Sequence, residues 1–293
     1  MIGKRHILAI PVLMLTALLS ATSGGGALAA EQPVAMVTEI SGEGELLRDG
    51  YAHSLRLLAE LEPNARVRLK KDARAVVMYL QSGDQYALSG PGAFTFGQDR
   101  PRAEKQAAAP MKLGPVSGKD GKAMQIRNAS LSQAGTVMRT GGRRPIPAKH
   151  PKAAVTLDTP SLFEWEIIGG GADYEFVLKD EKGNTLFSRV LPENRLSLPA
   201  DIALEAGAAY RWSVSARGGD GSRFLSVYTF RLADPDTRAG FDNFYPRETA
   251  TIAERVAFVA WLERNGLSEE AARYWDELSK RYGIYEPSRI SEK

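Results

Sequence analysis

The sequence contains no cysteine, and only three of its 293 residues are histidine. A chain without cysteine forms no disulfide, offers no thiolate nucleophile and provides no cysteine ligands for zinc. The two histidines beyond the N-terminal segment, His53 and His150, lie far apart in the sequence and show no metal-ligand spacing. We therefore expect neither a metal site nor a cofactor.

A strong excess of one charge is also lacking. The chain holds 38 Lys and Arg residues against 35 Asp and Glu residues, which gives a formal net charge of +3 at pH 7. Proteins that bind nucleic acids usually gather a large basic excess on one face, whereas the basic residues here are spread along the chain. We expect no nucleic-acid partner.

Long apolar runs are absent except near the N-terminus. There, a short basic start precedes the apolar run Ile7–Leu19, and small residues follow at Ala27–Ala30. This order predicts a secretory signal peptide over residues 1–29, with cleavage after Ala29 or, alternatively, after Ala30. The apolar run is shorter than the ~20 residues that cross a bilayer, so an uncleaved membrane anchor is the less favoured alternative. Since small exported eukaryotic domains usually carry disulfides, we expect a soluble bacterial protein of the periplasm with no transmembrane span.

Residues 30–98 contain short β-forming segments separated by turn residues. Arg66–Leu69 alternates polar with apolar residues, and Ala73–Leu80 is a longer run rich in β-formers. Turn sequences such as Ser89-Gly-Pro-Gly92 follow closely on these runs. This density of strands and turns predicts a compact all-β domain.

The order of these motifs resembles the FecR-type periplasmic domain. The resemblance rests on Gly44–Gly50, the leucine-rich stretch 55–61, the strand Val76–Leu80 and the bend 88–92. The sequence departs from the family at Gln81–Asp84, where the family tends to place an acidic residue and glycine. The cytoplasmic anti-sigma segment of the iron-uptake regulators is not seen, so their signalling role is not carried over.

Residues 99–153 have the biased composition of a linker, rich in basic residues, proline, glycine and alanine. Met124–Ile126 and Thr136–Met138 are candidates for strands that add to the sheet of the first domain. The basic stretch that includes Arg143 and Arg144 is either a solvated connector or a strip that touches anionic envelope polymers.

Residues 154–235 show alternation of apolar and polar residues over several segments, with Val177 as an exception. Phe163 and Trp165 alternate with glutamate, and Tyr210 and Trp212 alternate with polar residues. Alternation places one face of each strand in a core and the other in water, which predicts a β-sandwich.

The segment Leu204–Ala216 resembles the penultimate strand of fibronectin type III domains, in which a leucine, a turn glycine and a corner tyrosine precede the strand. This resemblance implies that the Tyr210 hydroxyl hydrogen-bonds to backbone upstream of it and stabilises the corner.

Residues 236–293 change to a helical period and predict an αα-hairpin that resembles one tetratricopeptide-type unit. One such unit cannot bury its own apolar face, so the hairpin either docks on the sandwich or receives a partner. Its aromatic residues Trp261, Tyr274 and Trp275 are candidate interaction residues, together with Arg143 and Arg144 of the linker.

The fold class is therefore predicted as mainly β, with an FecR-like domain, a fibronectin type III-like sandwich and a C-terminal αα-hairpin.

Histidine is the usual general base, and neither His53 nor His150 has an evident catalytic partner. We expect a non-enzymatic interaction or scaffold protein whose partner is an envelope protein. Binding of cell-wall glycan is the alternative, and a hydrolase ranks last.

Overall fold

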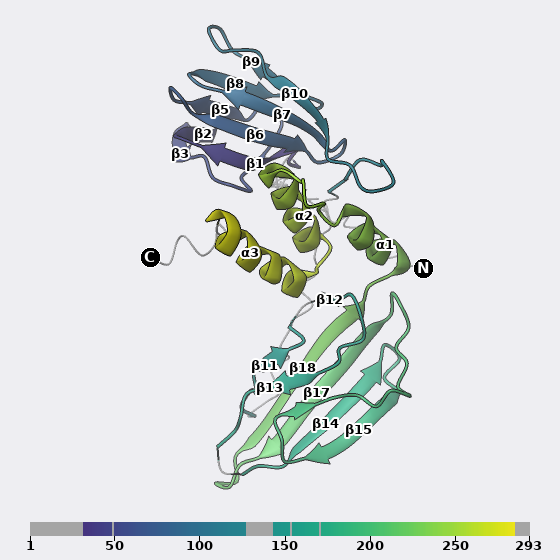
Figure 1. The fold of residues 1–293 in the computed structure, drawn as a ribbon. Coiled ribbons are helices and arrows are strands. Elements are labelled where there is room, and N and C mark those ends of the chain that lie inside the picture. The colour runs from purple at the N-terminus through teal and green to yellow at the C-terminus, as the bar shows by residue number, and fades with distance from the viewer. Residues whose placement is uncertain (1–31, 49, 127–142, 153, 170, 285–293) are drawn as a thin grey trace, which may run out of the picture. The chain divides into compact units, whose positions relative to one another are not determined.

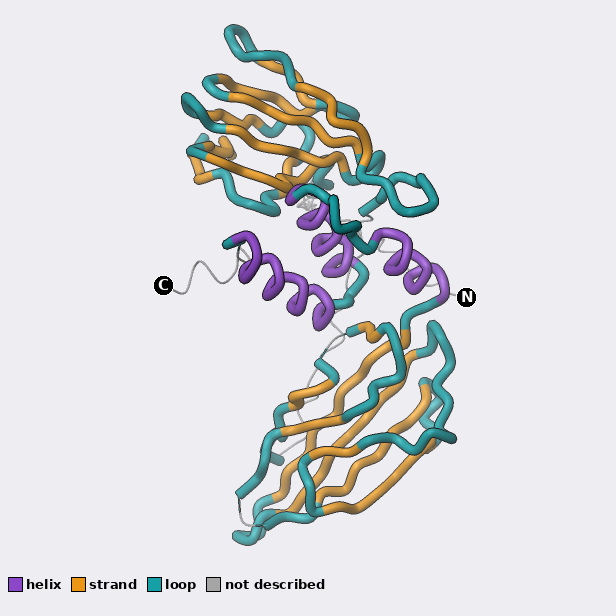
Figure 2. Tube along the Cα trace, viewed as in Figure 1, coloured by secondary structure: helices purple, strands orange, loops and turns teal. Residues whose placement is uncertain are grey.

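The computed structural model describes residues 32–48, 50–126, 143–152, 154–169 and 171–284. The predicted signal peptide and the predicted strand Thr136–Met138 lie outside the described residues. The described part is mainly β with helices towards its C-terminal end, which confirms the predicted fold class (Figure 1). Short loops join most of the strands (Figure 2).

The first ten strands form two five-stranded sheets. One sheet has the order β10-β7-β6-β1-β4, and the other has the order β3-β2-β5-β8-β9. Neighbouring strands in both sheets are antiparallel. The bounds are β1 (Ala35–Ser41), β2 (Gly44–Arg48), β3 (Tyr51–Ser54), β4 (Glu60–Leu61), β5 (Arg66–Leu69), β6 (Arg74–Tyr79), β7 (Asp84–Ser89), β8 (Gly92–Phe96), β9 (Pro101–Ala103) and β10 (Met111–Pro115).

The two sheets bury one shared apolar core. Strand β5 alternates exposed and buried residues, and its Val67 and Leu69 point into this core. Val77 of β6 and Phe94 of β8 come from different sheets and meet in the same cluster. The alternation that the sequence predicted for β5 is confirmed, because a strand with one face in a core exposes every second residue.

Strands β1 and β6 are buried on both faces. All five residues that follow Arg74 in β6 are buried, and so are the first four of β1. Met36 and Met78 therefore face away from the core between the sheets and pack into a second cluster that includes helix residues. An uninterrupted apolar strand of this kind needs cover on each side of its sheet.

Part of the segment predicted as a linker packs against this first β unit. It supplies β9 and β10, and the side chains of Met124 and Ile126 are buried beside the helices. The Ile126 N–H donates to the Leu80 carbonyl oxygen at 2.8 Å, just beyond the end of β6. Met124–Ile126 thus joins the first unit as an irregular segment.

The second β unit consists of a three-stranded sheet, β11-β13-β16, and a five-stranded sheet, β12-β18-β17-β14-β15. Only the β12–β18 pair is parallel among the strand pairs of these described residues. The bounds are β11 (Ala148–His150), β12 (Val155–Thr156), β13 (Phe163–Trp165), β14 (Tyr174–Asp180), β15 (Thr185–Leu191), β16 (Arg195–Leu196), β17 (Ala209–Arg217) and β18 (Arg223–Leu232). Phe163, Trp165 and Trp212 are buried in the core between the two sheets, where the alternation placed them.

The Tyr210 side chain ties the start of β17 to the preceding loop. Its hydroxyl oxygen accepts a hydrogen bond from the Glu205 N–H at 2.6 Å. The expected bond to upstream backbone is confirmed. Gly207 lies between the two residues with φ +78°, a left-handed conformation that glycine adopts without a steric penalty.

We expect Tyr210→Phe to lower the free energy of unfolding by about 1 kcal/mol, the usual net value of one such hydrogen bond. Urea denaturation of the full chain measures the change. Tyr51→Phe is the control, because the Tyr51 side chain is 72% exposed on β3. Equal stability of both variants would contradict a stabilising role for the Tyr210 hydroxyl.

Three helices follow in the described residues: α1 (Pro235–Phe244), α2 (Ile252–Arg264) and α3 (Ser268–Tyr282). The sequence predicted α2 and α3 but not α1, which has no fully buried residue and contains Gly240. Asp234 caps α1 by accepting from the Thr237 N–H at 2.7 Å. Thr251 and Glu254 form a capping box at the start of α2.

Candidate interaction site

Two of the three candidate aromatic residues of the hairpin belong to the core. Trp261 is 5% exposed and Trp275 is 2% exposed, and both pack in the cluster that contains Met36 and Met78 of the first β unit. The Trp275 Nε1–H donates to Glu263 Oε1 at 2.8 Å, so its polar group is also satisfied. These positions favour the docking interpretation for the hairpin.

The doubly buried sheet of the first β unit receives the apolar face of the hairpin, whereas the sequence had suggested the second β unit. The second β unit adds Val155 and Leu157 at the edge of this cluster, and the Val155 N–H donates to the Gly266 carbonyl oxygen at 3.1 Å. Helix α2 lies against β1 (Figure 1). Nine of the thirteen α2 residues are buried, which is consistent with a helix enclosed by a sheet on one side and by other helices elsewhere.

Tyr274, the third aromatic residue, is half-buried. Its ring meets Phe258 edge-on at a centroid distance of 5.0 Å and Tyr245 at 5.7 Å. Burial, with a smaller contribution from the hydroxyl of Tyr245, raises the pKa of Tyr274 above its usual range. Tyr274 is therefore a neutral residue at the edge of the helical core.

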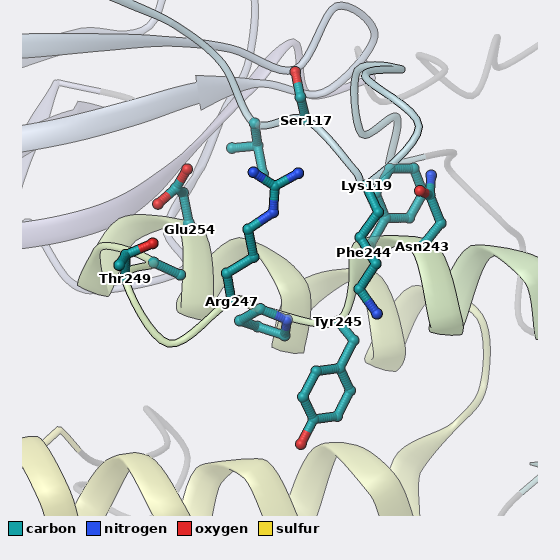
Figure 3. Close-up of a pocket in the computed structure, with 11 residues that line it drawn as sticks. Ser117, Lys119, Asn243, Phe244, Tyr245, Arg247, Thr249 and Glu254 are labelled. Carbon is teal, nitrogen blue, oxygen red and sulfur yellow. The ribbon is translucent and has the colours of Figure 1, made fainter.

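A small pocket of about 160 Å³ lies between residues 116–119, the end of α1 and the loop before α2 (Figure 3). Asn243 closes one side by exchanging two hydrogen bonds with Asp120, at 2.8 and 2.9 Å. Glu254 is already used by the α2 cap. Arg247 extends towards Ser117, whereas the Lys119 side chain lies beside Tyr245 (Figure 3). Because these cations do not converge, the pocket does not present them together to one anion.

A larger hollow, of about 650 Å³, lies on the outer face of the five-stranded sheet of the second β unit. Arg143 lines it, and so do Arg217 at the end of β17 and Arg223 at the start of β18. Arg217 and Arg223 are directly opposite each other in the β17–β18 ladder, and both are exposed. We call Arg143, Arg217 and Arg223 the arginine cluster.

Backbone pairing brings Arg143 to this place. The Arg144 N–H donates to the Arg223 carbonyl oxygen at 3.0 Å, and the Leu225 N–H donates to the Arg144 carbonyl oxygen at 3.1 Å. The residues around Arg144 thus extend the sheet beside β18. The structure brings Arg143 together with two arginines far away in the sequence, and no local pattern pointed to Arg217 or Arg223.

Arg144 is not among the residues that line the hollow. Its guanidinium lies over the Phe224 ring at 6.0 Å from the centroid, a cation–π contact. Asp220 in the β17–β18 turn has a lowered pKa, chiefly because Ser222 hydrogen-bonds to its carboxylate and also because of the Arg144 charge. The charge of Arg144 is partly balanced in this way.

The positive charges of the arginine cluster are not offset by a neighbouring carboxylate in this way. None of its three side chains makes an ion pair or a hydrogen bond with another described residue. Two acidic residues of the hollow, Asp173 and Glu175, lie on the side of β14. Glu175 accepts a hydrogen bond from the Ser215 hydroxyl at 3.1 Å. The hollow therefore has a basic side towards β18 and an acidic side towards β14.

Within the described ranges, no group of three or more His, Asp or Glu residues is placed to hold a metal ion. His53 is exposed on β3, and His150 Nδ1 lies 2.9 Å from Glu269 Oε2. None of the described helices has the length and apolar character that crossing a bilayer requires.

Comparison with known proteins gives no family. No family model matches the chain, and no curated protein matches it. Among solved structures, it is similar to a chain reported for the host cell surface retention of a 1.5-MDa bacterial ice-binding adhesin, at 11% identity and a TM-score of 0.22. The match covers 67% of this chain and 54% of that one, so the chain spans about half of the adhesin chain. A similarity this low carries no inference about function.

Proposed function

We propose that this chain is an exported, non-enzymatic interaction protein of the bacterial envelope, and that it binds a partner protein in the periplasm. Its binding surface would be the outer sheet face of the second β unit. The N-terminal leader pattern and the absence of cysteine support export into a bacterial envelope. The strand order of the second unit and the Tyr210 hydrogen bond agree with a fibronectin type III-like sandwich.

The hollow with the arginine cluster is the observation that carries this proposal. Trp261 and Trp275 of the hairpin are buried in a core, so they leave little apolar surface on which a partner protein could bind. The hollow instead combines exposed apolar and charged side chains on a rigid sheet. Val190 in it is 66% exposed, on edge strand β15. Rigid sheets with exposed apolar side chains are common protein-binding surfaces.

Binding of cell-wall glycan is less well supported. Glycan sites usually expose aromatic rings, whereas Trp165, Tyr210 and Trp212 are buried in the core of the second unit. Phe224, the aromatic residue of the hollow, is partly buried beneath Arg144. The hollow thus offers a sugar ring little aromatic surface on which to stack.

In-cell crosslinking tests the proposal. A photo-crosslinking residue at position 190, in the hollow, is expected to capture one dominant protein, which mass spectrometry identifies. The same residue at position 51, exposed on β3 of the first β unit, is the control. Capture of wall fragments alone, or the same captured proteins from both positions, would contradict the proposal.

A further inference from the structure

We propose that the hollow binds an acidic, partly apolar segment of the partner protein, whose carboxylates are bound by the arginine cluster. This inference rests on the proposed function and names the chemistry of the partner. Three observations support it: the arginine charges that the fold leaves unpaired, the fixed backbone positions of these arginines, and the other residues that line the hollow.

The unliganded hollow leaves like charges facing each other. Like charges directly opposite each other in an antiparallel pair destabilise a sheet, and Arg217 and Arg223 are such a pair. Asp173 is on the same side of the sheet, but no ion pair forms within 4.0 Å between it and either arginine. A bound carboxylate would offset this repulsion, which Asp173 and Glu175 on the other side of the hollow leave without an ion pair.

The backbone positions of the three arginines are preorganised. The longest ladder of the second unit, which runs from Ala209 to Arg217, fixes the backbone of Arg217 and Arg223. The hydrogen bonds of the adjacent Arg144 to β18 fix the backbone of Arg143. Guanidinium groups bind carboxylates with two parallel hydrogen bonds, and a fixed backbone reduces the entropy that is lost when the three side chains bind one segment.

The apolar lining of the hollow favours a peptide over a glycan or a membrane surface. Beside the arginines, the hollow is lined by Val177, Val190 and Leu225, which suit apolar side chains. Strand β15 at its border pairs only with β14 among the described residues, so its outer backbone edge is free for an extended peptide. A polyanionic glycan would use the arginines but not these apolar side chains.

Fluorescence anisotropy with the purified full-length chain provides the test. The probe is a labelled peptide of alternating glutamate and leucine, and the matched control probe alternates lysine and leucine. We expect the acidic peptide to bind, and the double variant Arg217→Glu, Arg223→Glu to weaken binding by roughly tenfold or more, as loss of charge pairs at an interface does. Arg211→Glu, on the same face of β17 but outside the hollow, should change binding by less than about twofold.

A thermal denaturation measurement distinguishes a loss of peptide binding from a loss of folding. Arg217→Ala removes the like-charge pair, so its thermal midpoint should equal or exceed that of the wild type while peptide binding still falls. Equal weakening by Arg211→Glu, equal binding of the basic peptide, or binding of polygalacturonate in place of the acidic peptide would each overturn the inference.

Crosslinking from position 190 separates this inference from the proposed function. If the double charge reversal abolishes capture of the dominant protein, the arginine cluster recognises that partner. If capture is unchanged, the interaction function stands and the acidic chemistry of the partner is wrong. If position 190 captures no protein in either background, the proposed function itself fails.

Discussion

Replacing Trp275 with alanine is expected to lower the free energy of unfolding by about 4 kcal/mol, the usual cost of removing a large aromatic side chain from a core. Trp275 is 2% exposed and lies with Trp261 and Met78 in the core shared by the helices and the first β unit. Its Nε1–H also donates to Glu263 at 2.8 Å, a bond that alanine cannot make.

Amide hydrogen exchange measures the loss of stability separately in each helix and strand. Amide protection in α2 and α3 should fall together with that in β1 and β6, because these elements share one core. Lys280→Ala is the control on the same helix: its ion pair with Asp276 lies at the surface, with the two side chains 74% and 54% exposed, and contributes less than about 1 kcal/mol. A Trp275→Ala variant with unchanged protection and lost partner capture would instead identify Trp275 as an interface residue.

Replacing Arg255 with methionine is expected to cost about 2 kcal/mol, because it leaves several carbonyl groups without their donor. The Arg255 side chain is 7% exposed, and its guanidinium donates to the carbonyl oxygens of Arg247, Glu248 and Ala250 at 3.0, 2.8 and 3.2 Å. It also lies over the Tyr282 ring at 5.8 Å. One side chain thus fixes the loop between α1 and α2 and contacts α3.

Urea denaturation compares three variants for this residue. Arg255→Met should be the least stable, and Arg255→Lys should fall between it and the wild type, since an ammonium group cannot reach three carbonyl oxygens in a planar array. Arg247→Ala should be neutral, because Arg247 contributes its backbone carbonyl and its side chain is exposed. Full stability of Arg255→Lys would show that charge alone, and not the fork of donors, holds the loop.

Several elements were predictable because their signals are local. Alternation in Phe163–Trp165 and Tyr210–Ala216 identified strands and their inward faces. Both segments are strands whose inward residues are buried, except Ala216, which is partly buried. The helical period and the stop at Asn265-Gly266 identified α2 and α3. Such patterns follow from backbone geometry, which repeats every two residues in a strand and about every 3.6 in a helix.

Helix α1 was missed although its start, Asp234-Pro235, is a usual helix N-terminus. It contains Gly240, which is unfavourable in a helix interior. In the structure a side-chain carbon at Gly240 would lie 2.7 Å from Trp261 Cζ2, so glycine permits close packing on α2. The run Ala75–Leu80 could have predicted a covering element such as α2, because a strand that is apolar on both faces needs cover on both sides of its sheet.

The sequence by itself determined most strands and their inward faces, helices α2 and α3, and the need of the helical hairpin for an apolar partner, and its resemblance to a known family implied the corner at Tyr210. Only the tertiary structure decided that this partner is the sheet of β1 and β6. Only it placed Arg143 beside Arg217 and Arg223, which are more than seventy residues away in the chain. The physical reason is that burial periodicity is a property of each local backbone, whereas the meeting of two distant surfaces depends on the path of the whole chain.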